Sequence, residues 1–192
     1  MHPIPKVRFE QFSDGVFAIA ITLLALELPT PAIPTNDVTE TLHALAPLVP
    51  GIITFLISFV TIAIFWVNHH QLTQLLDMIR RRRILWINML FLFFLTLIPF
   101  ITKEASASPF NPITVLSFSL FLFGASVSFS LLRYFIHKNA GEMHIPMGRS
   151  VVGPSIYLLA AAMTFLSVPA SYLLLAIPAL YYFLPKPTPE PR

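Results

Sequence analysis

The polar and ionisable side chains of this largely apolar sequence gather at the start of its first hydrophobic run. Arg8, Glu10, Ser13 and Asp14 fall directly before the stretch FAIAITLLALEL. Charged groups in a membrane segment are costly, so they mark either a functional site or a pairing between helices. Asp14 could attract cations to a pore mouth. We favour a structural role, in which its carboxylate pairs with Arg8 or with histidines of the second run.

Two adjacent histidines, His69 and His70, close the second hydrophobic run. Neighbouring residues of a helix point about 100° apart, so the two rings cannot both ligate one metal ion. The chain has no Cys, which excludes thiolate zinc sites, iron–sulfur clusters, disulfides and a cysteine nucleophile. The serines have no paired base, and the 6 glycines form no phosphate-binding loop. We therefore expect neither an enzyme nor a resident cofactor or metal.

One stripe of bulky aliphatic residues follows the polar group. Ile19, Leu23 and Leu26 are spaced i, i+4 and i+7, which places them on one face of a helix. Thr22 lies beside this stripe, and the neighbouring alanines would permit close helix approach. Periodicity alone is explained most simply by ordinary helix packing.

These residues must be positioned by membrane helices, because the composition is not that of a soluble domain. Hydrophobic residues make up 56% of the 192, and charged residues only 11% against roughly 25% in soluble proteins. The mean hydropathy is +0.76. A span needs about 20 apolar residues, so six spans would use about 120 and leave room for loops. We predict an all-α membrane protein with six transmembrane helices in one domain over residues 1–192.

Breaks in the apolar pattern define the expected spans. Prolines in 29–34 end the first, four arginines at 80–83 end the second, and Lys103 with Glu104 closes the third. A polar segment follows the fourth, and Pro169 is expected to form a tight turn between the last two. The predicted spans are 9–28, 48–70, 84–101, 113–136, 151–168 and 170–184.

The basic residues predict the orientation of these spans. Lys and Arg are retained on the cytoplasmic side, and 11 of the 12 fall on one side of the six-span map. Only Lys103 falls on the other, so both termini should be cytoplasmic. The arginine run is then a topology and headgroup anchor, not a voltage sensor or a nucleic-acid patch. We expect no nucleic-acid partner.

Two motifs carry a resemblance to a known family. The stretch RFEQFSD at residues 8–14 resembles the RxxxFSD signature that opens the first helix of the transmembrane protein 175 family of potassium channels. FWVNHH at residues 65–70 is similar to that family's second motif. Six spans match one family repeat, and a chain with one repeat implies a homotetramer around a central pore, embedded in a bacterial-type cell membrane.

The resemblance also implies roles for individual residues. The first helix would line the pore, with Ile19 as an aliphatic constriction, Leu23 and Leu26 further outward, and Thr22 as a pore hydroxyl. No TVGYG sequence occurs, so a filter of backbone carbonyls is not expected; K⁺ would pass a hydrophobic gate instead. An inter-helix network is implied for Arg8, Phe12, Ser13, Asp14, Trp66, His69 and His70, to which polarity alone adds Asn88.

Three functions therefore remain open at this point. The first is a passive, potassium-permeable channel. The second is a proton-coupled or cation secondary transporter that uses Asp14 with the His69 and His70 pair. The third is a membrane scaffold without transport activity.

Overall fold

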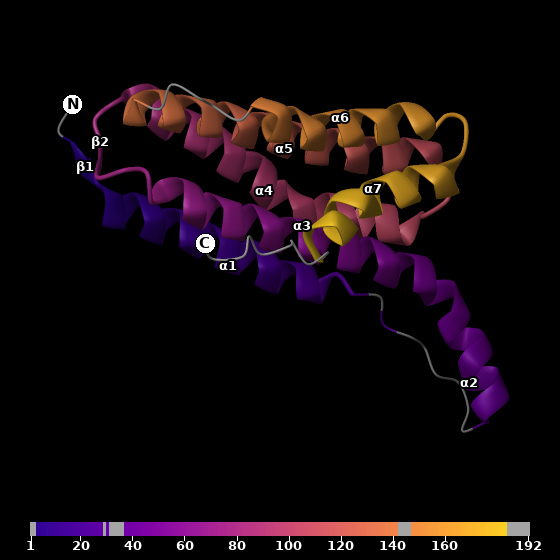
Figure 1. Cartoon of the computed structure of the whole chain (residues 1–192). Coiled ribbons are helices and arrows are strands. Elements are labelled where there is room, and N and C mark those ends of the chain that lie inside the picture. Colours follow the sequence, from indigo (N-terminus) through magenta and orange to yellow (C-terminus); the bar gives the residue numbers. More distant parts are fainter. Residues whose placement is uncertain (1–2, 29, 31–36, 142–146, 184–192) are drawn as a thin grey trace, which may run out of the picture.

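Helices account for almost all of the protein in the computed structural model, which describes residues 3–28, 30, 37–141 and 147–183 (Figure 1). The long elements are α1 (Lys6–Leu26), α3 (Val49–Thr73), α4 (Arg82–Ala107), α5 (Pro112–Ala140), α6 (Met147–Met163) and α7 (Val168–Phe183). A short helix α2 (Val38–Leu45) and a 3₁₀ turn η1 (Ala46–Leu48) lead into α3. Two-residue strands, β1 (Ile4–Pro5) and β2 (Met78–Ile79), precede α1 and α4.

The expected fold class, an all-α membrane protein, is confirmed by these helices. Four helical segments are long and apolar enough to cross a membrane: α1, the continuous segment Val38–Thr73, α4 and α5. The helices α6 and α7 are apolar but have only 17 and 16 residues, fewer than the roughly 20 of a full span. The protein is a multi-pass membrane protein, and its six main helices overlap the six predicted spans.

At two points the helices differ from the course expected for the chain. The third helix was expected to close at Lys103 and Glu104, but α4 continues to Ala107 because both residues are good helix formers. Lys103 Nζ also lies 3.4 Å from Oε2 of Glu27, the residue that directly follows α1. Pro169 was expected to form the last turn, yet it is the second residue of α7. Proline is tolerated there because the first turn of a helix needs no N–H donor.

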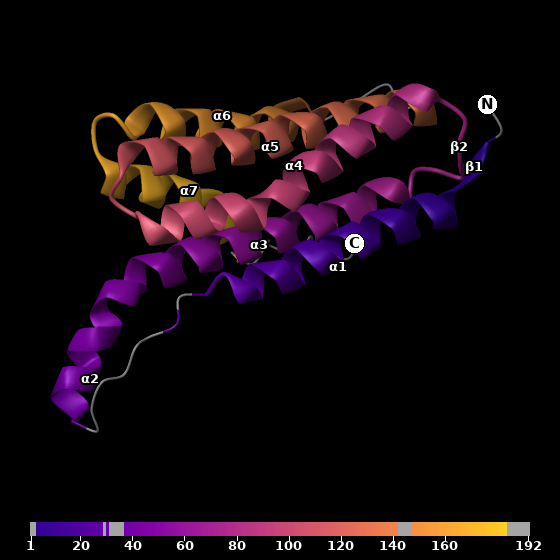
Figure 2. The same ribbon diagram turned by 180° about the vertical axis from the view of Figure 1, so that it is seen from behind.

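The helix α2 was also not predicted, since its sequence is polar. Asp37 caps its start by accepting hydrogen bonds from the backbone N–H groups of Thr39, at 2.8 Å, and Glu40, at 3.0 Å. An acidic cap followed three residues later by Glu is a helix-start signal that the sequence does contain. Figures 1 and 2 show α2 apart from the other helices, at the end of the molecule opposite β1 and β2.

The helix α1 lies on the outside of the bundle (Figures 1 and 2). It contacts α3 and α4, whereas α4 packs on α5, α5 on α6, and α6 on α7. The strands tie its start to the segment before α4, because β1 pairs antiparallel with β2 and places Ile4 opposite Ile79. One side of α1 is therefore held by the bundle, and most residues on its other side are exposed in the single subunit.

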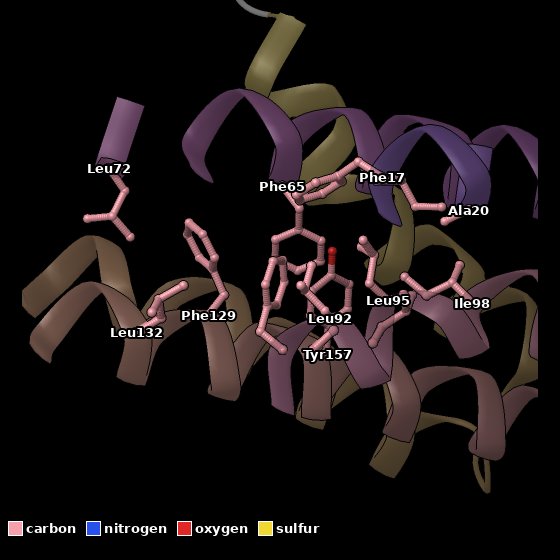
Figure 3. Packing of buried hydrophobic residues seen from close by; sticks show 14 of the residues in the cluster. Phe17, Ala20, Phe65, Leu72, Leu92, Leu95, Ile98, Phe129, Leu132 and Tyr157 are labelled. Atoms are coloured by element: carbon pink, nitrogen blue, oxygen red, sulfur yellow. The ribbon is translucent and has the colours of Figure 1, made fainter. Parts of the chain in front are cut away.

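Aromatic rings fill the centre of the bundle. Phe65 of α3, Phe91 of α4 and Phe129 of α5 meet with ring centroids 5.2–5.6 Å apart, in tilted and edge-on geometries. Such arrangements are favourable for aromatic pairs. Figure 3 shows Phe65 and Phe129 pointing into the same space between the helices. This cluster fixes α4, on which α1 packs.

Gly124 of α5 allows a close approach to α4. A Cβ atom added there would lie 2.5 Å from Phe94 Cε1, whereas one added at Gly15 of α1 meets nothing within 4 Å. We expect Gly124→Ala to lower the free energy of unfolding by about 1 kcal/mol relative to Gly15→Ala, because the ring must shift. Melting curves followed by circular dichroism in detergent measure this. Equal midpoints for the two variants would contradict the close contact.

Candidate functional site

The helix α1 has one buried and one open face. Its buried residues are Phe9, Ser13, Phe17, Ala20 and Leu24. The predicted stripe lies on the open side, where Ile19 is 58%, Leu23 45% and Leu26 77% exposed in the single subunit. Packing inside the subunit therefore does not explain the stripe.

Polar residues share the open face with the stripe. Gln11, Asp14 and Thr22 are all exposed in the single subunit. The Thr22 hydroxyl donates to the carbonyl oxygen of Ile19 at 2.9 Å. Its hydrogen is thus used within the helix, and the lone pairs of its oxygen are what the hydroxyl can offer to a cation. A face that combines these groups suits contact with water better than contact with lipid tails.

A buried chain of hydrogen bonds holds the other face of α1. Asn88 of α4 donates through Nδ2 to Ser13 Oγ at 3.1 Å, and its Oδ1 lies 3.0 Å from His69 Nε2 of α3. Ser13 in turn donates to the carbonyl oxygen of Phe9 at 3.0 Å. The side chains of Ser13, Asn88 and His69 are at most 1% exposed. With Asn88 in this orientation, His69 is the donor to Oδ1, and three helices are joined by one hydrogen-bonded network.

Aromatic rings enclose the imidazole of this network. The His69 ring lies between Phe9 and Phe91, with centroids 5.9 and 6.1 Å away and interplanar angles of 16° in both cases. Phe17 contacts the same ring at 5.6 Å. The imidazole therefore has few rotamers available, which fixes the position of its Nε2 atom toward Asn88.

Asp14 makes a second bridge between α1 and α3. Its Oδ1 accepts a hydrogen bond from Trp66 Nε1 at 3.0 Å, and the Trp66 ring stacks on His70 with centroids 6.2 Å apart. The carboxylate is exposed and lies at the edge of the open face. The structure thus gives Asp14 a partner different from the predicted Arg8 or histidines.

The region that contains these site residues is similar to known proteins. The family model described as "Endosomal/lysosomal potassium channel TMEM175" matches residues 8–99, which carry α1, α3 and most of α4. A protein of Chamaesiphon minutus named as a potassium channel is 30% identical over 190 residues, which cover 92% of this chain and 93% of that protein. The chain belongs to the TMEM175 family.

A solved structure and an animal protein also resemble this TMEM175 family member. The crystal structure of a lysosomal potassium-selective channel TMEM175 homolog from Chamaesiphon minutus superposes with a TM-score of 0.81 at 30% identity, over 92% of this chain and 95% of that one. The endosomal/lysosomal proton channel TMEM175 of Gallus gallus is 41% identical over 76 residues, 36% of this chain and 15% of that protein. The resemblance drawn from the two sequence motifs is thereby confirmed.

Three residues of the implied network form no hydrogen bond or ion pair between helices among the described residues of the single subunit. Arg8 is exposed and forms no hydrogen bond or ion pair with the described residues. Phe12 is 54% exposed, and His70 is exposed and only stacks on Trp66. Their assignment to an inter-helix network stays a prediction. Within the described residues, no group of three or more His, Cys, Asp or Glu side chains is placed to hold a metal ion.

One connection between α1 and α3 was missed by the sequence analysis. Thr73 Oγ1 donates to Glu10 Oε1 at 2.6 Å, and Lys6 Nζ lies 3.7 Å from the same carboxylate oxygen and 2.8 Å from Gln74 Oε1. The spacing of Lys6, Glu10 and Ser13 on one helix face was a usable signal. The partners on α3 were not readable, because the register of α3 against α1 is not encoded in local spacing.

Proposed function

We propose that this TMEM175 family member is a passive, potassium-permeable channel, in which four copies of a single six-helix domain surround a central pore. The observation that carries this proposal is the open face of α1, which is unpacked in the single subunit and combines an aliphatic stripe with polar groups. Such a face needs a partner surface or water, and a symmetric ring of α1 helices supplies both. A secondary transporter is not favoured by the relatives, and we assign no catalytic role.

In this proposal the gate is a set of aliphatic rings. Ile19 from each subunit forms the narrowest ring, with Leu23 and Leu26 further outward. A tight apolar ring excludes water and blocks ions, and it conducts only when widened or wetted. Thr22 places a hydroxyl oxygen next to the narrow ring, where a partly dehydrated potassium ion needs oxygen ligands.

The basic residues support an orientation for the pore. The strands β1 and β2 and the start of α4 lie at one end of the molecule, opposite α2 (Figure 1). This end holds Lys6, Arg8 and the arginines at 80–83, so the positive-inside rule places it in the cytoplasm. Asp14, near the same end of α1, then lies toward the inner mouth of the pore.

A flux assay with the purified full chain tests this proposal. Liposomes that contain the protein and are loaded with potassium should release potassium down its gradient. Liposomes loaded with sodium instead should release their ion more slowly. A proton arm, read by an internal pH dye, is included because the Gallus gallus relative is named a proton channel. Mass measurement in detergent should give four subunits. Silent liposomes from folded protein, or proton flux stoichiometrically coupled to a cation, would contradict a passive potassium channel.

A further inference from the structure

A basic cavity lies where α4 begins and α5 ends, away from α1. It has a volume of about 340 Å³. The lining residues are Arg81, Arg82, Arg83, Ile84, Phe135 and Lys138. Four of the six are cationic and come from two helices, so the cavity is a concave site and not only a run of charge along one loop.

Among the residues that the structure describes, no acidic side chain forms an ion pair with the cations of this cavity. The start of α4 has no acidic residue in its first turn, and Arg81 at the N-cap makes no side-chain capping hydrogen bond. The positive end of the helix dipole therefore adds to the field of the arginines. Among the described residues, the side chains of the three lining arginines and Lys138 form no salt bridge or hydrogen bond.

Aromatic rings orient two of these cations. Arg83 Cζ lies 5.1 Å from the ring centroid of Phe135, and Lys138 Nζ lies 5.6 Å from that of Tyr134. A cation held against a ring face keeps its N–H groups available, because the ring accepts no conventional hydrogen bond in their place. The two cations thus present N–H donors to an anion in the cavity.

The level of the cavity in the membrane narrows the choice of anion. Trp86, one turn further along α4, is 63% exposed, and tryptophan is enriched where the headgroups meet the hydrocarbon. The arginines before it then lie among the headgroups, with Ile84 and Phe135 toward the hydrocarbon side. Guanidinium groups bind phosphate oxygens in a bidentate manner, and a lysine adds a compact positive charge.

We propose that this cavity binds the phosphate group of an anionic phospholipid. Basic pockets between helices on the cytoplasmic side are suited to phospholipid headgroups. Inorganic phosphate carries the same chemical group without acyl chains, so it is the second possible source. The proposal goes beyond channel activity and does not depend on the pore.

Native mass spectrometry of the full chain in nonionic detergent tests the proposal. Dioleoyl phosphatidic acid should bind at least tenfold more tightly than dioleoyl phosphatidylcholine. We expect Arg83→Gln and Lys138→Gln each to weaken phosphatidic acid binding about tenfold, because each substitution removes charge-assisted hydrogen bonds to the phosphate oxygens. Arg80→Gln is the matched control, because it removes the same charge from the same run at a residue that does not line the cavity. The affinity of Arg80→Gln for phosphatidic acid should stay within about twofold of the wild type, because salt screens an exposed charge that does not contact the phosphate.

Two results would overturn the site. One is equal affinity of the wild type for the anionic and the zwitterionic lipid. The other is a loss in Arg80→Gln as large as in Arg83→Gln and Lys138→Gln, which would mean diffuse attraction without a specific cavity. Displacement by millimolar inorganic phosphate assigns the site to the phosphate group alone, and resistance to it assigns the site to the phospholipid. Unchanged circular dichroism spectra verify that the variants are folded.

Discussion

Potassium flux through the reconstituted protein should rise about tenfold when Ile19 is replaced by Asn, which corresponds to about 1.4 kcal/mol off the barrier to conduction. Ile19 is 58% exposed in the single subunit and belongs to the stripe assigned to the pore. A ring of amide side chains holds water where a ring of isoleucines excludes it. The water-free, non-conducting state of the constriction is therefore no longer favoured in free energy. The preference for potassium over sodium should fall as well, because a wetted ring no longer requires the ion to shed water.

The measurement is single-channel recording in a planar bilayer, with potassium and sodium on opposite sides. Ile113→Asn is the matched control, since Ile113 is also aliphatic and 70% exposed but lies on α5. Its conductance and reversal potential should match the wild type. If Ile19→Asn also leaves both quantities unchanged, the constriction is not at Ile19, and the same substitution at Leu23 and Leu26 becomes the next test.

Much of this structure could be predicted from local sequence patterns. Helix periodicity depends only on residues a few positions apart, so the Ile19, Leu23 and Leu26 stripe was readable from the sequence and lies on one open face of α1. Hydropathy likewise located the long helices. Asp37 and Glu40 offered an equally local signal for α2, and Val38, Leu42 and Leu45 have the i, i+4, i+7 spacing of an apolar stripe. The segment was nevertheless read as a loop, because its polar residues were given more weight than this spacing.

Long-range register was not readable in the same way. Asn88 was placed near the network by polarity alone, and its contacts with Ser13 and His69 depend on how three helices are shifted against one another. The partner of Glu10 is Thr73, 63 residues away, and no pattern marked it. The β1–β2 pair consists of two-residue strands, one of which contains Pro5, and is too short to produce an alternating pattern.

Replacing Asn88 by Leu should lower the free energy of unfolding by about 3 kcal/mol, because two buried groups lose a partner at once. Leucine has a similar volume but cannot accept from His69 Nε2 or donate to Ser13 Oγ. Ser13 keeps its bond to the Phe9 carbonyl, whereas the buried His69 ring then has no hydrogen-bond partner among the described residues. Unfolding by SDS titration in mixed micelles gives the free-energy change.

A double-mutant cycle with Ser13→Ala separates the bridge from the packing. A coupling of about 1 kcal/mol between the two substitutions is expected if the Asn88–Ser13 bond holds α1 to α4. Thr96→Val is the control on the same helix, because that exposed hydroxyl bonds only the Phe93 carbonyl; it should show no coupling with Ser13→Ala. Strictly additive effects of Asn88→Leu and Ser13→Ala would mean that the Asn88–Ser13 bond does not hold α1 to α4, so that α1 is held by apolar packing and by its bonds to α3.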